Sequence, residues 1–115
     1  MTVIIRRATI EDVQLLTYLN RVVHEPHVKH HPNQYKPFIP NNPELIEIYK
    51  NRINDETCFT FIAQDNDRGV GYVQCFVQEK REHAFGYGKI DCYIDQIAVL
   101  ETHQSYGLFG IKGLY

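Results

Sequence analysis

Side chains that can bind a metal are concentrated in one short stretch of the sequence. They are His24, Glu25, His27, His30 and His31. If a helix continued past Pro26, His24, His27 and His31 would share one face of it, and three imidazoles could hold zinc or nickel. The proline within the run, with no nearby cysteine and no obvious orienting carboxylates, favours solvated loop histidines instead. We therefore predict no metal site.

The three cysteines offer little chemistry. Cys58, Cys75 and Cys92 show no C-x-x-C spacing, and an odd number does not suit a disulfide framework. Each lies in a run of residues that predicts a strand. We expect small, reduced and buried side chains here, not nucleophiles.

Local signals in the first half of the chain predict one strand and two helices. Residues 3–7 are suited to a strand, and Thr9 with Asp12 three positions later predicts a helix start. Apolar residues then recur at helical spacing, and Pro26 is expected to end or kink this helix. The prolines within residues 26–43 predict a long, stiffened loop before a second helix.

The second half is rich in β-branched and aromatic residues. Residues 57–64 and 70–78 are separated by the turn-forming sequence DNDRG, which predicts a hairpin. Residues 90–100 have apolar side chains on both alternating sides, so we expect a central strand with both faces covered. The order strand, helix, helix and three strands predicts an α/β fold of the α+β type, with a mostly antiparallel sheet and helices on its faces.

The sequence YIDQIAVLETHQSYG at residues 93–107 resembles the central strand and following loop of the GNAT superfamily of acyl-CoA-dependent N-acetyltransferases. In that family the strand leads into a Q/R-x-x-G-x-G/A loop that opens a helix, and Gln104 and Gly107 match this loop. The segments IIRRAT before IEDVQLL, and RGVGYVQCFV, are similar to the family's first strand and helix and to its third strand. The resemblance spans residues 3 to about 108 and implies a GNAT-like sheet in the order β-α-α-β-β-β.

The resemblance implies acetyl-CoA as the cosubstrate. A helix N-terminus offers free amide groups to a diphosphate, and a glycine lets the backbone approach the phosphate oxygens. Where the family's central strand splays from its neighbour, free backbone groups receive the pantetheine arm, and one amide faces the thioester oxygen. The residues implied for the cofactor are Ile97, Ala98, Val99, Gln104, Ser105, Tyr106, Gly107 and Leu108.

Asp95 is the first candidate for the catalytic base, because the acceptor amine must lose a proton. It precedes Ile97, the first of the candidate oxyanion amides, by two residues, so strand alternation predicts that both lie on one side. Asp91 and Glu101 are weaker candidates. The alternative is that Asp95 is a polar strand residue paired locally.

In this family the loop between the first two helices walls the acceptor pocket. The resemblance therefore implies that Tyr35 and Phe38, with the nearby histidines, line the site for the acceptor. The alternative is an aromatic loop that simply packs on the sheet.

The chain departs from the family pattern after Gly107. Phe109 stands where Gly or Ala is expected, and the family continues with two helices and at least one further strand. We expect one incomplete domain over residues 1–115 that lacks the C-terminal half of the fold, and we leave open whether its last six residues are native. A buried strand without its neighbour exposes an apolar edge, so we expect a homodimer or other self-association, or a truncated product of a longer reading frame.

The function that the resemblance implies is acetyl transfer from acetyl-CoA to a small-molecule or peptide amine, with turnover in doubt because of the missing half. The alternative is a non-catalytic module that self-associates or binds a small molecule. A formal net charge of −2 gives no general attraction to nucleic acid or anionic membranes, so neither is an expected partner. Only three consecutive aliphatic residues precede Arg6 and Arg7, too few for a signal segment, and we predict a cytoplasmic protein.

Overall fold

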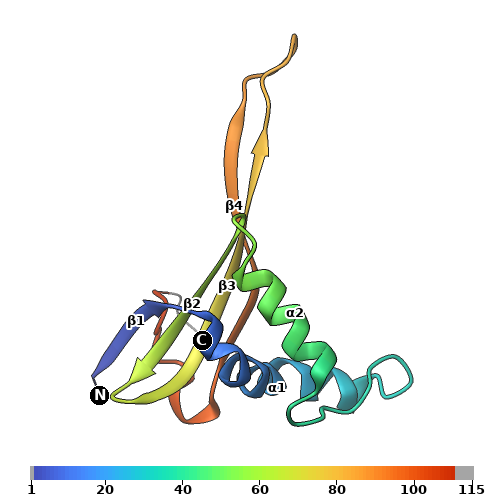
Figure 1. Ribbon diagram of the computed structural model, residues 1–115, viewed down its shortest axis with the longest axis vertical. Helices are drawn as coiled ribbons and strands as arrows, with labels where there is room; N and C mark the ends of the chain where they lie inside the picture. Colours follow the sequence, from blue (N-terminus) through green and yellow to red (C-terminus); the bar gives the residue numbers. More distant parts are fainter. Residues whose placement is uncertain (1, 111–115) are drawn as a thin grey trace.

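The computed structural model describes residues 2–110 and contains a four-stranded antiparallel sheet with two α-helices, joined by two single-turn 3-10 helices (Figure 1). In chain order the elements are β1 (Val3–Arg7), η1 (Ile10–Asp12), α1 (Val13–His30), α2 (Pro43–Ile53), β2 (Cys58–Asp65), β3 (Arg68–Lys80), β4 (Lys89–Val99) and η2 (Glu101–His103). The strands lie in the order β1-β2-β3-β4. The predicted fold class and element order are confirmed.

Both α-helices pack on one face of the sheet (Figure 1). Leu16 and Leu19 of α1, Tyr49 of α2, Ile62 of β2 and Tyr72 of β3 are at most 1% exposed and form the centre of the core. We expected helices on both faces. In residues 2–110 the second face carries none, and it presents an apolar groove of about 420 Å³.

The start of the first helical segment is fixed by a buried carboxylate, as the sequence predicts. Asp12 accepts a hydrogen bond from the backbone N–H of Thr9 at 2.7 Å and two from the guanidinium of Arg6 at 2.7 and 2.8 Å. These donors stabilise the charged carboxylate, so Arg6 above all lowers the pKa of Asp12. The pair ties β1 to the helices.

The expected helix end at Pro26 is wrong, because α1 continues through Pro26 to His30. A proline removes the hydrogen bond to the carbonyl four residues back and its ring crowds that carbonyl, at a cost of about 3 kcal/mol or more. Packing of the apolar side of α1 on the sheet outweighs that loss. The loop before α2 is shorter than predicted as a result.

None of the helices in residues 2–110 combines the length and apolar character that crossing a lipid bilayer requires.

Strand β4 lies at the edge of the sheet within residues 2–110, which corrects the expectation of a central strand covered on both faces. Ile90 is 72% exposed and Ile94 is 50% exposed. Both residues alternate correctly for a buried strand, but no described element covers them. The sequence pattern reports which side chains need burial and not which partner supplies it.

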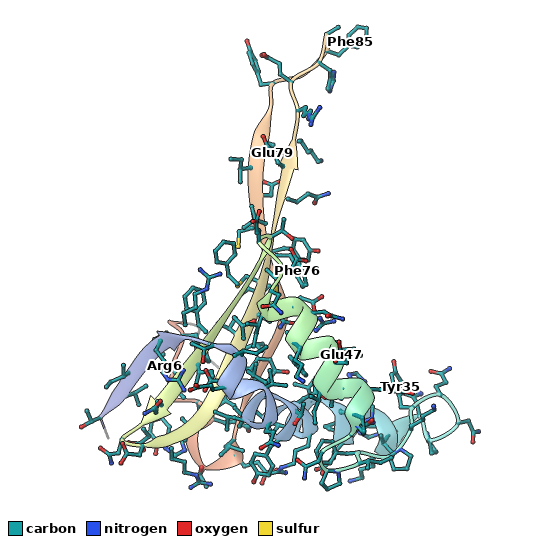
Figure 2. The ribbon with its side chains drawn as sticks, viewed as in Figure 1. Arg6, Tyr35, Glu47, Phe76, Glu79 and Phe85 are labelled. Atoms are coloured by element: carbon teal, nitrogen blue, oxygen red, sulfur yellow. The ribbon has the colours of Figure 1, made fainter. Side chains whose placement is uncertain are left out.

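Strands β3 and β4 extend beyond the body of the domain as a two-stranded arm, residues 78–91 (Figures 1 and 2). The register of β2 against β3 stops at the pair Cys58 and Phe76, so β3 continues with β4 alone. At the tip of the arm, Phe85 is 97% exposed and Tyr87 is 91% exposed.

Candidate functional site

A β-bulge in β4 lies at the centre of the candidate site. Gln74 pairs with Gln96 and Cys75 pairs with Ile94, which leaves Asp95 as an extra residue without a partner on β3. Asp95 and Gln96 both contact α2, since Asp95 Oδ2 lies 3.8 Å from Arg52 Nη1 and Gln96 Oε1 accepts from Tyr49 Oη at 2.9 Å.

The bulge places Asp95 and Ile97 on opposite sides of β4, whereas the sequence predicted one side for both. Ile97 pairs with Val73, which lines the groove on the helix-free face. Asp95 and Ile97 therefore do not share a side of the strand, because the extra residue shifts the alternation by one. A pattern that is apolar on both sides gives no sign of this shift.

Hydrogen bonds show which backbone groups of β4 face its outer edge. The N–H of Leu100 donates to the carbonyl of Val70 on β3 at 2.8 Å. Backbone groups alternate along an antiparallel strand, so those of Ala98 also face β3, whereas those of Ile97 and Val99 face outward. Gln104 Nε2 donates to the carbonyl of Val99 at 3.0 Å. Ile97, which is half-buried, is left with the more accessible outward groups.

A groove of about 300 Å³ runs along this edge. Its lining residues are Val22, Val23 and Pro26 of α1, Ile97, Ala98 and Val99 of β4, and Gln104. Four residues that the resemblance implied for the cofactor thus line one surface. The backbone of Ala98 is directed at β3, so this residue can contribute only its other atoms to the groove.

The loop after β4 keeps its backbone donors free. Within residues 2–110, no N–H group of residues 104–109 donates to another part of the chain. Ser105 and Gly107 have positive φ angles of 70° and 64°, which turn the chain back on itself. Successive N–H groups in such turns form concave sites for anions. The predicted residues Ser105, Tyr106, Gly107 and Leu108 all belong to this loop, and Tyr106 is 64% exposed.

Two anchors hold the loop against the sheet. His103 Nε2 lies 2.8 Å from Asp65 Oδ2 at the end of β2. Leu108 and Phe109 line the apolar groove on the helix-free face together with Phe61. Phe109, the residue that departs from the family pattern, therefore packs against the sheet. The helix implied after the loop falls outside the described residues.

Gln96 belongs to a buried polar network that the sequence did not predict. Tyr49 Oη and Tyr72 Oη are 2.9 Å apart, and each is within 2.9 Å of Gln96 Oε1. Asn20 Nδ2 donates to Tyr72 Oη at 3.3 Å. Burial raises the pKa of both phenols, so they remain protonated donors. The one available signal was that tyrosine and glutamine occupy inward positions of otherwise apolar elements.

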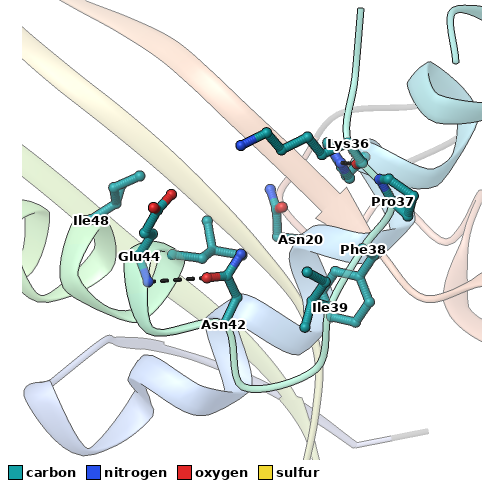
Figure 3. Close-up of a pocket in the computed structure, with 10 residues that line it drawn as sticks. Asn20, Lys36, Pro37, Phe38, Ile39, Asn42, Glu44 and Ile48 are labelled. Atoms are coloured by element: carbon teal, nitrogen blue, oxygen red, sulfur yellow. Dashed lines mark hydrogen bonds between the residues drawn. The ribbon is translucent and has the colours of Figure 1, made fainter. Parts of the chain in front are cut away.

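A second pocket, of about 200 Å³, lies between α1, the following loop and α2 (Figure 3). Phe38 lines it, together with the charged side chains of Lys36 and Glu44. Asn20 lies in its wall and connects it to the tyrosine network. Tyr35 is not part of the lining.

Tyr35 instead packs against the histidines at the end of α1. Its ring centroid lies 6.2 Å from that of His24, 5.0 Å from that of His27 and 6.4 Å from that of His31. The continued helix does bring these three histidines to one side, but their imidazoles surround a phenol ring. In the part of the chain that the structure describes, no three His, Cys, Asp or Glu side chains are placed to hold a metal ion.

The weaker candidates for the base lie apart from the network. Asp91 forms an ion pair with Lys89 at 3.2 Å, beside the arm. Glu101 is exposed in η2. Asp95 is itself the bulge residue and is the carboxylate nearest in sequence to Ile97, whose N–H faces outward.

Comparison with known proteins gives one family match and several similar structures. Residues 25–108 match the acetyltransferase (GNAT) family. The tetramutant of the BH1408 protein from Bacillus halodurans is 23% identical, with a TM-score of 0.76 over 91% of this chain and 67% of that one. An acetyltransferase from Vibrio fischeri is 19% identical, with a TM-score of 0.65 over 90% of this chain and 75% of that one.

A predicted acetyltransferase with acetyl-CoA from Clostridium acetobutylicum is 16% identical, with a TM-score of 0.65 over 95% of this chain and 67% of that one. At these identities the likeness shows the fold alone. No curated protein matches the sequence.

Proposed function

Because the chain belongs to the acetyltransferase (GNAT) family, we propose that it binds acetyl-CoA along the outer edge of β4 and transfers the acetyl group to an amine. The observation that carries the proposal is the combination of outward backbone groups at Ile97 with a loop at residues 104–109 whose N–H groups are free within the described chain. Acetyl-CoA needs both kinds of donor: a strand amide for its thioester arm and, beyond it, the amides of a turn for its diphosphate.

The diphosphate is assigned to the loop and the pantetheine arm to the groove of about 300 Å³. Free N–H groups in a turn bind phosphate oxygens without any basic side chain, which suits a chain with a formal net charge of −2. Gln104 occupies the carbonyl of Val99, so the polar groups of the arm are left to Ile97. The N–H of Ile97 is also the proposed donor to the thioester oxygen. As one oxyanion donor, it stabilises the transition state by about 3 kcal/mol.

In the proposed reaction the amine nitrogen attacks the thioester carbonyl carbon. The C–N bond forms, the C–S bond breaks, and the coenzyme leaves as a thiolate that takes up a proton from solvent. Asp95 is proposed to take the proton that the amine loses, directly or through a water molecule. The carboxylate is 36% exposed and lies on the α2 side of the bulge, next to Gln96.

The acceptor is proposed to enter through the pocket of about 200 Å³ between α1 and α2. Phe38 and Ile48 provide apolar walls, and Glu44 provides a carboxylate. The apolar walls and Glu44 suit a small amine or a peptide end, while Lys36 in the same lining opposes any second positive charge on the acceptor.

Thermal unfolding with and without acetyl-CoA tests the proposal. Ligand at about 100 times its dissociation constant adds about 2.7 kcal/mol to the free energy of unfolding. Pantetheine, which lacks the diphosphate, is the matched control ligand and is expected to stabilise less. If millimolar acetyl-CoA leaves the melting temperature unchanged, the binding proposal is wrong.

The second candidate is a non-catalytic module that self-associates. The exposed apolar edge of β4 favours it, since Ile90 and Ile94 are uncovered within the described residues. Self-association without any response to acetyl-CoA selects this candidate over the enzyme.

A further inference from the structure

The outer edge of β4 is not paired within residues 2–110, either in the arm or where β4 joins the body of the domain. A two-stranded hairpin is marginally stable by itself, and residues 78–91 project from the body in this form (Figure 2). The outer edge of β4 also carries the exposed residues Ile90 and Ile94. An edge of this kind is a template for a further strand.

The register shows which residues offer their backbone groups at this edge. The N–H of Val77 donates to the carbonyl of Thr57 at 2.8 Å, so the backbone groups of Val77 face β2. Cys92 is the partner of Val77 on β4, and its own N–H and C=O therefore point away from β3. Ile90 and Ile94 alternate in phase with Cys92 and face outward in the same way.

We propose that two copies of this chain pair through β4, antiparallel, about a twofold axis at Cys92. Cys92 then lies opposite the partner's Cys92, and Ile90 lies opposite the partner's Ile94. All three outward residues of each copy exchange backbone hydrogen bonds in this register. The apolar side chains of the pair join on the helix-free face, where both copies present Ile90, Cys92 and Ile94.

Charge selects this register over its neighbours. With the axis at Cys92, Lys89 lies opposite the partner's Asp95, so two opposite-charge pairs form across the interface. An axis at Asp91 would place that carboxylate against the partner's Asp91. An axis at Tyr93 would place Asp91 against the partner's Asp95. Like charges directly opposite destabilise a strand pair.

Registers centred on Ile90 or Ile94 are disfavoured for a different reason. They carry the pairing into the connection before Lys89 or past the bulge at Asp95 to Ala98, whereas the proposed register ends at Asp95. The proposed pairing uses residues 89–95 only and leaves the outward groups of Ile97 unpaired. It leaves the proposed acetyl-CoA groove open but engages Asp95, the proposed base, so dimerisation and binding of acetyl-CoA are measured separately.

Sedimentation of the full 115-residue chain tests the proposal. We expect a dimer of twice the 13.5 kDa chain mass. Lys89→Glu places like charges opposite each other in both symmetric pairs and is expected to raise the dissociation constant about tenfold. Adding Asp95→Lys to this variant restores the attraction and the dimer. Lys29→Glu, exposed on α1 and outside both strands of the arm, is the matched control and leaves the dimer unchanged.

Thiol cross-linking tests the axis itself. In an antiparallel pair, opposite Cα atoms that exchange hydrogen bonds are about 5.5 Å apart, within reach of a short bis-maleimide. Each Cys92 sulfur adds across one maleimide double bond, and its proton goes to the adjacent carbon. A Cys75→Ser background removes the neighbouring thiol, and the protein is expected to give a covalent dimer that Cys75→Ser/Cys92→Ser does not give. A monomer at every soluble concentration, a dimer indifferent to Lys89→Glu, or no cross-link through Cys92 overturns the proposal.

Discussion

Replacing Gln96 with leucine tests the polar network directly. Tyr49 and Tyr72 are at most 1% exposed, and Gln96 Oε1 accepts from both hydroxyls, at 2.9 and 2.8 Å. Without that oxygen, the two hydroxyls can still bond each other across 2.9 Å, but only one of their two hydrogens is then used. One buried donor without a partner costs about 1–3 kcal/mol. We therefore expect Gln96→Leu to lower the free energy of unfolding by that amount.

Urea unfolding measures this free energy, and the melting temperature gives a second readout. In a domain of this size, 1 kcal/mol corresponds to about 4 °C. Gln78→Leu is the matched control, because Gln78 is exposed on the same sheet and its replacement is expected to change stability by at most about 0.5 kcal/mol.

A triple variant checks the count of hydrogens. Tyr49→Phe and Tyr72→Phe, added to Gln96→Leu, remove both buried donors together with their acceptor and leave unmade only the longer bond from the half-buried Asn20, so they are expected to cost less than one fully buried donor without a partner. The triple variant is therefore expected to be more stable than Gln96→Leu alone. If Gln96→Leu costs no more than Gln78→Leu, or if the triple variant is the least stable of the three, the reasoning is refuted.

Three further predictions concern the edge of β4, acid and alkali. Ile97→Pro removes an outward N–H and should lower the rate of acetyl transfer about 10²–10³-fold while the fold is retained. Ala98→Pro removes a hydrogen bond to β3 and should lower the melting temperature. A wild-type rate of acetyl transfer in Ile97→Pro contradicts the assignment. Arg6 lowers the pKa of Asp12 in the folded state, so stability is present above the unfolded pKa of about 3.9 and is lost below it. Acid unfolding of Asp12→Asn should lack this dependence, and an unchanged acid limb argues against the pair. Burial raises the pKa of Tyr49, so stability should fall as pH rises above about 10, where unfolded phenols ionise; equal alkaline limbs for wild type and Tyr49→Phe would exclude that cause.

Local signals were enough to predict the elements and their order. Asn42 caps α2 by accepting from the N–H of Glu44 at 3.1 Å, with Pro43 at the first helical position. The turn between β2 and β3 contains Asn66 with a φ of 53°, in the sequence that predicted the hairpin. Interactions of this kind join residues a few positions apart, so their signature is written in short stretches of sequence.

The same locality explains what could be said of the site. The strand and loop at residues 93–107 were recognised from sequence, because one continuous segment carries the residues. The network of Tyr49, Tyr72 and Gln96 was not, because α2, β3 and β4 contribute one residue each. No spacing in the sequence relates positions that meet only when the sheet and the helix pack.

The sequence by itself determined the strands, the helices, their order and the family to which the loop belongs. Tertiary structure alone decided that α1 runs through Pro26, that Asp95 forms a bulge, and that β4 lies at the edge of the described sheet. Each of these depends on pairing between distant segments. A strand that is apolar on both faces can be placed in a sheet with either face toward the helices. Only the competition among the elements for burial and hydrogen bonds fixes its register and its position in the sheet.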